Sequence, residues 1–277
     1  MAIRRIPKFA YIAIASAISL TLGLSGCAQN ATDPVAKRDL KTVTLIAHDS
    51  FSMSKELVAA FEAETNYKLE IIKSGDAGAM TNKLVLTKDQ PLGDVVFGID
   101  NTYAPVANQN GIMDGDLTAI DFGDVCLNYD KQWFAKNELK APESLADLTK
   151  PDYADLTVLT NPASSSPGMA FLAAAVDVFG DAGYAQYLQA LKSNGVKIAA
   201  GWEDAYFTDF SGSSGKGPRP IVLSYSTSPA FEVRDDGQSQ TASVLNGCFR
   251  QTEFAGVLAG TDNPAGAKAL IDFMLAE

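Results

Sequence analysis

The fold class is decided by one stretch near the beginning of the chain, residues 42–73 (TVTLIAHDSFSMSKELVAAFEAETNYKLEIIK). Its first six residues have the β-branched, apolar composition of a buried strand. Residues 54–64 then repeat apolar positions at helical spacing, behind Ser54 as a candidate N-cap. Residues 68–73 return to a strand pattern. A strand, a helix and a second strand in this order predict α/β layers.

The alternation continues along the rest of the chain. Further strands are predicted at residues 94–97, 124–129, 157–160, 196–200 and 221–224, and further helices at residues 79–86, 168–179, 184–191 and 264–276. Residues 211–220 (SGSSGKGPRP) are predicted to form a mobile surface loop in which Lys216 and Arg219 are solvated rather than catalytic. This order of elements predicts an α/β protein with largely parallel strands.

The amino end has the layout of a secretory signal at residues 1–26. Three basic residues precede an apolar run, residues 9–24, which is too short and too weakly flanked for a spanning helix. The tetrapeptide LSGC ends at Cys27 and resembles the bacterial lipobox, in which the cysteine is acylated and becomes the mature amino terminus. The alternatives are an ordinary cleaved signal and an uncleaved anchor. We predict a lipid on Cys27 and therefore an extracytoplasmic, membrane-anchored lipoprotein.

Residues 27–41 are polar and lack an apolar period, so we expect a flexible tether between the lipid and the folded part. The remaining residues, 42–277, suffice for one large or two small domains. Removal of the signal would lower the formal net charge from −11 to −14, because the signal carries three positive charges and no negative one. Such a charge argues against nucleic acid as a partner and suits a cationic ligand.

Two cysteines, Cys126 and Cys248, follow Cys27 in the sequence. An even pair in an exported protein is most simply a disulfide, with two separate buried thiols as the alternative. The bridge would close a loop of about 120 residues and stabilise the fold by up to about 4–5 kcal/mol. Because His48 is the one histidine in the chain, a His/Cys metal site is disfavoured and no metal is predicted.

Motifs of the common catalytic and cofactor sites are absent from the sequence. The chain has no Gly-x-Ser-x-Gly elbow, no Walker loop, no Gly-x-Gly-x-x-Gly and no Cys-x-x-Cys motif. A serine hydrolase needs a base beside its nucleophile, and His48 is the only imidazole. We therefore predict no catalytic residue and no cofactor, and a binding protein rather than an enzyme.

Five short segments carry a family resemblance. In chain order they are residues 49–51 (DSF), 93–101 (GDVVFGIDN), 164–168 (SSSPG), 201–206 (GWEDAY) and 223–230 (LSYSTSPA). Their order and spacing resemble the thiamine-binding proteins of ABC-type thiamine importers, which are periplasmic-type solute-binding proteins. The similarity spans residues 42–276.

The resemblance implies a type II periplasmic-binding-protein-like α/β fold with a ligand cleft between two lobes. Residues 42–120 together with 248–277 would form the first lobe, and residues 121–247 the second. Cys126 and Cys248 would then both lie near the lobe crossings, which favours a disulfide beside the hinge.

The resemblance also implies a ligand, namely thiamine, thiamine monophosphate or thiamine diphosphate, which a monomeric protein delivers to the membrane subunits of an ABC transporter. The thiazolium cation favours aromatic faces, each worth about 0.5–2 kcal/mol, and a carboxylate. A phosphate would favour backbone amides at a helix start, as at residues 164–168, or at residues 74–78, where Asp76 would repel it. The residues predicted to bind the ligand are Asp49, Asp100, Ser164, Ser165, Ser166, Gly168, Trp202, Tyr206, Tyr225 and Ser226.

Each of these residues also has a purely structural interpretation. Trp202 and Tyr206 are spaced to pack together in a core. Tyr225 follows a strand and suits interior packing, and Asp100 suits a cap on the next helix. Residues 164–166 suit a polar turn that caps a helix without any ligand.

Two departures from the resemblance bear on affinity more than on ligand class. Relatives continue past the final helix with an aromatic segment that contributes to the cleft, and residues 116–121 are shorter than the corresponding crossing segment. The rival interpretation is the same fold with Fe(III), a polyamine or an oxyanion as the solute. A less favoured class is an extracytoplasmic hydrolase or a surface adhesion lipoprotein. The sequence leaves open the choice between free thiamine and its phosphates.

Overall fold

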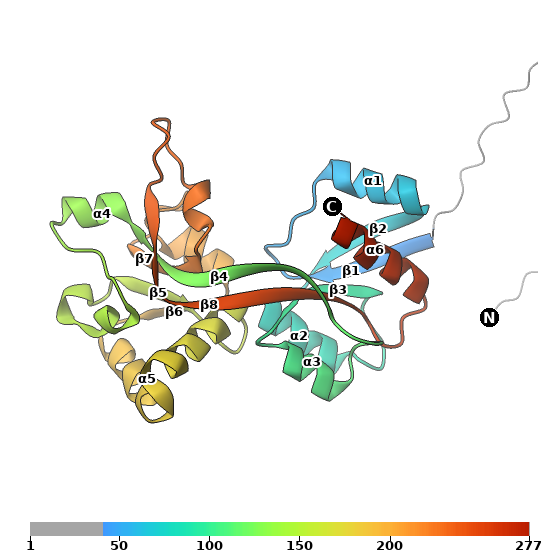
Figure 1. The fold of residues 1–277 in the computed structure, drawn as a ribbon, viewed down its shortest axis with the longest axis horizontal. Helices are drawn as coiled ribbons and strands as arrows, with labels where there is room; N and C mark the ends of the chain where they lie inside the picture. Colours follow the sequence, from blue (N-terminus) through green and yellow to red (C-terminus); the bar gives the residue numbers. More distant parts are fainter. Residues whose placement is uncertain (1–40, 277) are drawn as a thin grey trace, which may run out of the picture. The chain divides into compact units, whose positions relative to one another are not determined.

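The computed structural model describes residues 41–276. The predicted signal, the lipid on Cys27 and all but the last residue of the predicted tether lie outside these residues. Eight strands form one mixed sheet in the order β2-β1-β3-β8-β4-β7-β5-β6 (Figure 1). The α/β class is confirmed. No helix within this range combines the length and the apolarity needed to cross a membrane.

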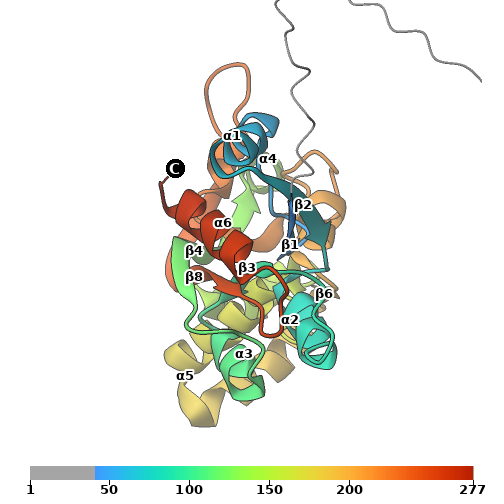
Figure 2. The same cartoon turned by 90° about the vertical axis from the view of Figure 1, so that its right-hand side faces the viewer.

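The first lobe surrounds three neighbouring parallel strands. Its elements are β1 (Lys41–Ala47), α1 (Lys55–Thr65), β2 (Tyr67–Lys73), α2 (Ala77–Leu86), β3 (Val95–Asp100), α3 (Ala104–Asn110) and α6 (Pro264–Ala276). β1 pairs in parallel with both β2 and β3. Helices α1 and α6 cover one face of these strands, and α2 and α3 cover the other (Figures 1 and 2).

Alternate side chains of these strands enter two separate hydrophobic cores. Val43 and Leu45 pack with α1 and α6, whereas Ile46 and Val96 pack with α2 and α3. Because both faces are covered, β3 is buried along its whole length and β1 over its last three residues, whereas the edge strand β2 alternates polar and apolar residues. The predicted N-cap is confirmed, since the side chain of Ser54 accepts a hydrogen bond from the backbone amide of Leu57, in the first turn of α1, at 3.2 Å.

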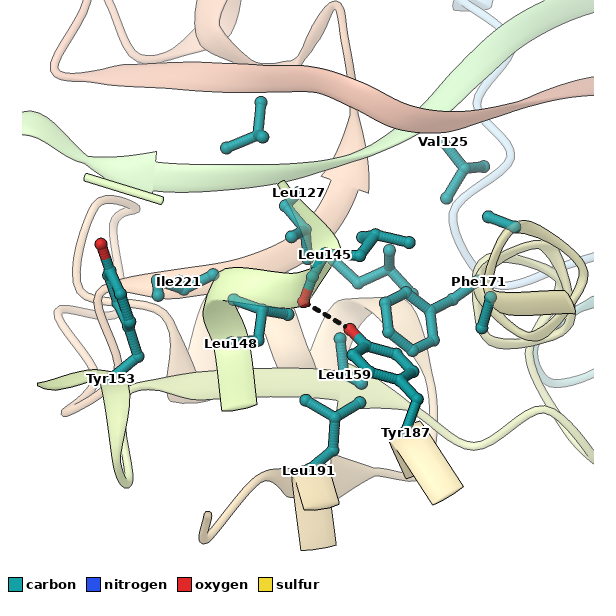
Figure 3. Packing of buried hydrophobic residues seen from close by; sticks show 14 of the residues in the cluster. Val125, Leu127, Leu145, Leu148, Tyr153, Leu159, Phe171, Tyr187, Leu191 and Ile221 are labelled. Atoms are coloured by element: carbon teal, nitrogen blue, oxygen red, sulfur yellow. Dashed lines mark hydrogen bonds between the residues drawn. The ribbon is translucent and has the colours of Figure 1, made fainter. Parts of the chain in front are cut away.

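The second lobe is built on β5, which pairs in parallel with β6 and β7. Its elements are α4 (Lys131–Lys136), β5 (Thr157–Thr160), α5 (Ser166–Ser193), β6 (Lys197–Ala199), the π-helix η3 (Asp204–Asp209), β7 (Ile221–Tyr225) and the short 3-10 helices η1 (Leu145–Thr149), η2 (Pro151–Tyr153) and η4 (Ser228–Phe231). Figure 3 shows its core, in which Phe171 and Leu159 pack beside Tyr187. The hydroxyl of Tyr187 donates to the carbonyl of Leu145 at 2.8 Å, so this buried polar group is satisfied.

Two long strands, β4 (Thr118–Asp130) and β8 (Thr241–Val257), run antiparallel to each other and connect the two lobes (Figure 1). β8 also pairs with β3, and β4 also pairs with β7, in both cases antiparallel. The expectation of largely parallel strands therefore holds for β1, β2 and β3 and for β5, β6 and β7, and is wrong for every pairing made by β4 or β8. The predicted bridge between Cys126 and Cys248 is confirmed and joins β4 to β8. The exact lobe boundaries stay a prediction.

Two local expectations need correction, and a third is confirmed. β8 was not expected, because its sequence mixes polar and apolar residues without a regular period and much of the strand is only partly buried. The two helices predicted at residues 168–179 and 184–191 are confirmed, because α5 is broken between them where Gly180 takes φ 71° and ψ 168°. Arg219 is not merely solvated, because its guanidinium donates to the carbonyls of Thr157 at 3.0 Å and Gly195 at 2.7 Å.

Candidate functional site

A cavity of about 310 Å³ lies between the two lobes. Its lining residues all follow the carboxyl end of a strand or begin the helix after it, which is where ligands bind in open α/β sheets. From the first lobe they are Asp49, Ser50, Gly75, Asp76 and Ala79, and from the second lobe Ser164, Ala200, Gly201, Trp202, Glu203 and Asp204. The volume falls at the lower end of the range for small-molecule pockets, about 300–1,000 Å³.

Trp202 forms the aromatic wall of the cavity. Its ring stacks on Tyr206 with centroids 4.9 Å apart and an interplanar angle of 21°, and meets the edge of Phe207 at 5.5 Å. The indole Nε1 donates to the Oγ of Ser224 at 2.9 Å. Ser224 is fully buried and in turn shares a hydrogen bond of 2.7 Å with Ser228. These contacts hold the indole plane in one orientation, which is what a flat ligand requires for stacking.

Hydrogen bonds join the lobes along the edges of the cavity. The carboxylate of Asp76 caps α2 by accepting from the amide of Ala77 at 2.7 Å, and its other oxygen accepts from the amide of Trp202 at 2.9 Å. The amide of Ala79 donates to the carbonyl of Ser164 at 3.0 Å. Since each of the last two bonds has one partner in each lobe, the described conformation has the lobes in direct contact.

The cavity is strongly acidic. Asp49, Asp76, Glu203 and Asp204 line it, and its lining contains no lysine, arginine or histidine. A neighbouring cation, Lys73, donates from its Nζ to backbone carbonyls, among them that of Asp49 at 2.9 Å. Burial lowers the pKa of Lys73, while the charges of Asp49 and Glu203 oppose this shift. A concave site lined by one sign of charge concentrates ligands of the opposite sign.

The structure brings three of the ten predicted ligand residues, Asp49, Ser164 and Trp202, to the cavity wall. Tyr206 supports Trp202 from behind, and its hydroxyl donates to Glu232 at 3.0 Å. The ring centroid of Tyr225 lies 6.2 Å from that of Trp202. Burial raises the pKa of Tyr225, so the phenol stays neutral.

The other predicted residues lie away from the cavity wall. Asp100 is fully buried and accepts from the amides of Thr102 at 2.8 Å and Tyr103 at 3.0 Å, which is the capping role noted as its alternative. Burial raises its pKa, and the hydrogen bonds oppose that shift. The remaining four are Ser165 and Ser166, which are buried, Gly168, which packs on the carbonyl of Thr160, and Ser226, whose amide donates to Asp124.

The prediction did not assign ligand roles to the acidic pair Glu203 and Asp204, although both lie in the quoted segment 201–206. It also missed Ser50 and Ala200. The signal that identifies them is position, because each comes within a few residues of the carboxyl end of a strand. A carboxylate in such a place is a candidate wall residue even without a motif.

A second polar cluster lies where the crossing strands meet the first lobe. His48 Nε2 is 3.5 Å from Glu253, which pairs across the strands with Asp121 and accepts from Gln251 at 2.8 Å. Burial, and next the charge of Glu253, raise the pKa of Asp121 to about 6. Residues 41–276 contain no group of three or more His, Cys, Asp or Glu side chains arranged to hold a metal ion.

Two α/β lobes connected by long crossing strands, with a ligand-sized cavity between them, define a two-lobed solute-binding protein of the type II periplasmic-binding-protein fold. Residues 92–277, about two thirds of the chain, match the family of bacterial extracellular solute-binding proteins. The chain belongs to this family.

Individual relatives are more specific. The thiamine-binding periplasmic protein of Escherichia coli is 29% identical over 263 residues, which cover 88% of this chain and 78% of the relative. The protein of the same name from Brucella suis is 29% identical over 253 residues, which cover 84% and 74% respectively. Among solved structures, a periplasmic thiamin binding protein matches with a TM-score of 0.72 at 26% identity, covering 84% of this chain and 78% of that chain.

Proposed function

We propose that this protein binds thiamine outside the cytoplasm and delivers it to the membrane subunits of an ABC transporter. The observation that carries the proposal is the oriented face of Trp202 beside an acidic cavity, in a chain whose relatives are thiamine-binding proteins over most of its length. The thiazolium of thiamine is a permanent cation, and a cation over an aromatic face gains about 0.5–2 kcal/mol. The role is binding, without catalysis.

Binding would proceed by closure of the two lobes on the ligand. The hydrogen bonds from Trp202 to Asp76 and from Ala79 to Ser164 join the lobes only when the cleft is closed. A ligand that fills the cavity in this state and is lost from the open state shifts the population toward closure. The closed form is the one that would dock, as a monomer, on the transporter.

The proposal also includes attachment of the protein to the membrane by a lipid. A lipid on Cys27, followed by the tether of residues 27–41, would confine the two lobes to the membrane face where the transporter lies. Substitution of Cys27 by Ala should move the protein from the membrane fraction to the soluble extracytoplasmic fraction, while its purified form still binds thiamine. Retention of the variant in the membrane would contradict lipid anchoring and would leave the proposal that the protein binds thiamine unaffected.

Thermal unfolding with a panel of solutes tests the ligand. Thiamine at 100 times its dissociation constant should stabilise the protein by about 2.7 kcal/mol, which raises the Tm by roughly 5–10 °C for a chain of this size. Spermidine, Fe(III) and sulfate represent the rival solutes on the same fold. Stabilisation by one of these, with no shift from thiamine, would overturn the proposal.

A further inference from the structure

We propose that Asn246 is a site of spontaneous covalent modification, at which the side-chain amide is converted to a carboxylate by reaction with the following glycine and with water. The chain contains three Asn-Gly pairs, which begin at Asn110, Asn194 and Asn246. The reacting groups are the same in all three, so the fold decides which pair reacts. Asn246 lies in β8, outside the cavity lining, and the inference does not depend on the ligand.

The reaction is an attack of the chain on its own side chain. The backbone nitrogen of the glycine gives up its proton and bonds to the side-chain carbonyl carbon of the asparagine. The bond from that carbon to the side-chain nitrogen breaks, and the nitrogen takes up the proton and leaves as ammonia. Water then opens the cyclic imide to aspartate or isoaspartate, without oxidation or reduction. Glycine favours the attack because it has no Cβ and a permissive backbone.

Asn246 lies in an exposed bulge of β8. Pairing with β4 continues to Val244 and resumes at Phe249, so the four residues 245–248 oppose a single residue, Cys126. The side chain of Asn246 is exposed, and no hydrogen bond from another residue in the range 41–276 holds it. It is therefore free to rotate toward the nitrogen of the next residue, and water can reach the imide.

The same bulge requires glycine after Asn246. Gly247 has φ +86°, a conformation that side chains rarely allow, and a Cβ at this position would lie 2.8 Å from the Cγ of Leu145. The fold thus demands at position 247 the residue that makes the preceding asparagine most reactive.

The pair at Asn194 is held by contacts on both reacting groups. The Nδ2 of Asn194 donates to the carbonyls of Leu148 at 2.8 Å and Lys150 at 2.9 Å. The amide of Gly195 donates to the carbonyl of Lys192 at 3.2 Å. The side chain must leave its acceptors and the glycine nitrogen must lose its hydrogen bond before the attack can occur.

The pair at Asn110 is held in the same way at the end of α3. The Nδ2 of Asn110 donates to the carbonyl of Val106 at 2.8 Å, and the amide of Gly111 donates to the carbonyl of Asn108 at 3.2 Å. Each hydrogen bond that must break slows the reaction by roughly fivefold. Both protected pairs should therefore react at least roughly tenfold more slowly than Asn246.

Peptide mapping by mass spectrometry measures the three rates in one sample. The intact, oxidised protein is incubated in mildly alkaline buffer below its unfolding transition, in water enriched in heavy oxygen so that only newly formed carboxylates are counted. We expect conversion of Asn246 at least roughly tenfold faster than that of Asn110 or Asn194. The variant N246Q has a longer side chain that disfavours the cyclic imide, so this peptide should stay unconverted while the other two keep their slow rates.

A second incubation, in denaturant with a reductant, separates the fold from the local sequence. The three pairs should then react at similar rates, because the contacts that protect two of them are lost. Conversion of Asn246 in the folded protein as slow as that of Asn194 would overturn the proposal. An equally large excess at Asn246 in the unfolded chain would assign the cause to neighbouring residues and would overturn it as well.

Discussion

Replacement of Trp202 by alanine is the substitution whose effect on ligand binding can be worked out most fully. It removes the ring that stacks on Tyr206 at 4.9 Å and the hydrogen bond to Ser224 at 2.9 Å. Truncation of a fully buried tryptophan costs about 3–5 kcal/mol, and because Trp202 is only partly buried we expect a loss of about 2–3 kcal/mol of folding stability. The backbone bond to Asp76 does not depend on the side chain and should survive.

The variant should also bind thiamine more weakly, for a reason separate from its loss of stability. Without the ring, thiamine loses a cation–π contact worth about 0.5–2 kcal/mol and the apolar area of the stack. We expect a total of about 1.5–3 kcal/mol, which is a weakening of roughly 10- to 150-fold. The assay is titration calorimetry with thiamine, with a thermal melt of each variant to verify that it is folded. Trp202→Phe keeps an aromatic ring but lacks the indole hydrogen-bond donor, so it should lose less affinity than the alanine variant. A folded alanine variant with wild-type affinity would refute the reasoning and leave Trp202 with a packing role only.

Three further substitutions test the framework around the cleft. Replacement of Cys126 and Cys248 by serine opens a loop of 122 residues and should cost up to about 4–5 kcal/mol in denaturant unfolding; the same stability for variant and oxidised wild type would contradict the bridge. Asp121→Asn should leave stability unchanged near pH 4 and raise it at pH 7 by about 1 kcal/mol or less, given solvent screening of this partly exposed group. The sign follows from its raised pKa of about 6, since the folded carboxyl holds a proton that the unfolded one releases, so stability falls as the pH rises through this window. Gly98→Ala should destabilise by about 2–3 kcal/mol, because φ is +98° and the new methyl carbon would lie 2.2 Å from the ring of His48; an alanine variant as stable as wild type would show that this corner of the first lobe relaxes freely.

Much of the secondary structure could be predicted from local sequence patterns, because strand composition and helix-start signals are local properties. The residues of β5 were predicted without error, and the final helix begins at Pro264 as its sequence indicates. The crossing strand β8 was missed because a half-exposed strand of mixed polarity has no period of its own and is held by pairing with β3 and β4. The disulfide was anticipated from two cysteines in an exported chain, and the resemblance implied its place near the lobe crossings; the structure shows that it joins β4 to β8.

The sequence indicated which segments form the candidate site, but it identified fewer of the individual residues that line the cavity. Trp202 lies on the cavity wall, as the resemblance of its segment implied, and it also stacks on Tyr206, as the spacing of the two residues indicated. Asp100 lies at the end of a strand as well, yet its carboxylate turns back to cap the next helix, and only the backbone geometry decides between these two directions. Glu203 has no motif of its own, and only its position shortly after the end of β6 indicates a place on the cavity wall.

The central claim, that thiamine lies in the acidic cavity against Trp202, is tested most directly by a crystal structure of the protein grown with saturating thiamine. We predict a ligand whose aromatic ring stacks on the exposed face of Trp202, with its cation facing the carboxylates of Glu203, Asp204 and Asp49. An empty cavity at saturation, or thiamine bound elsewhere on the chain, would contradict the account.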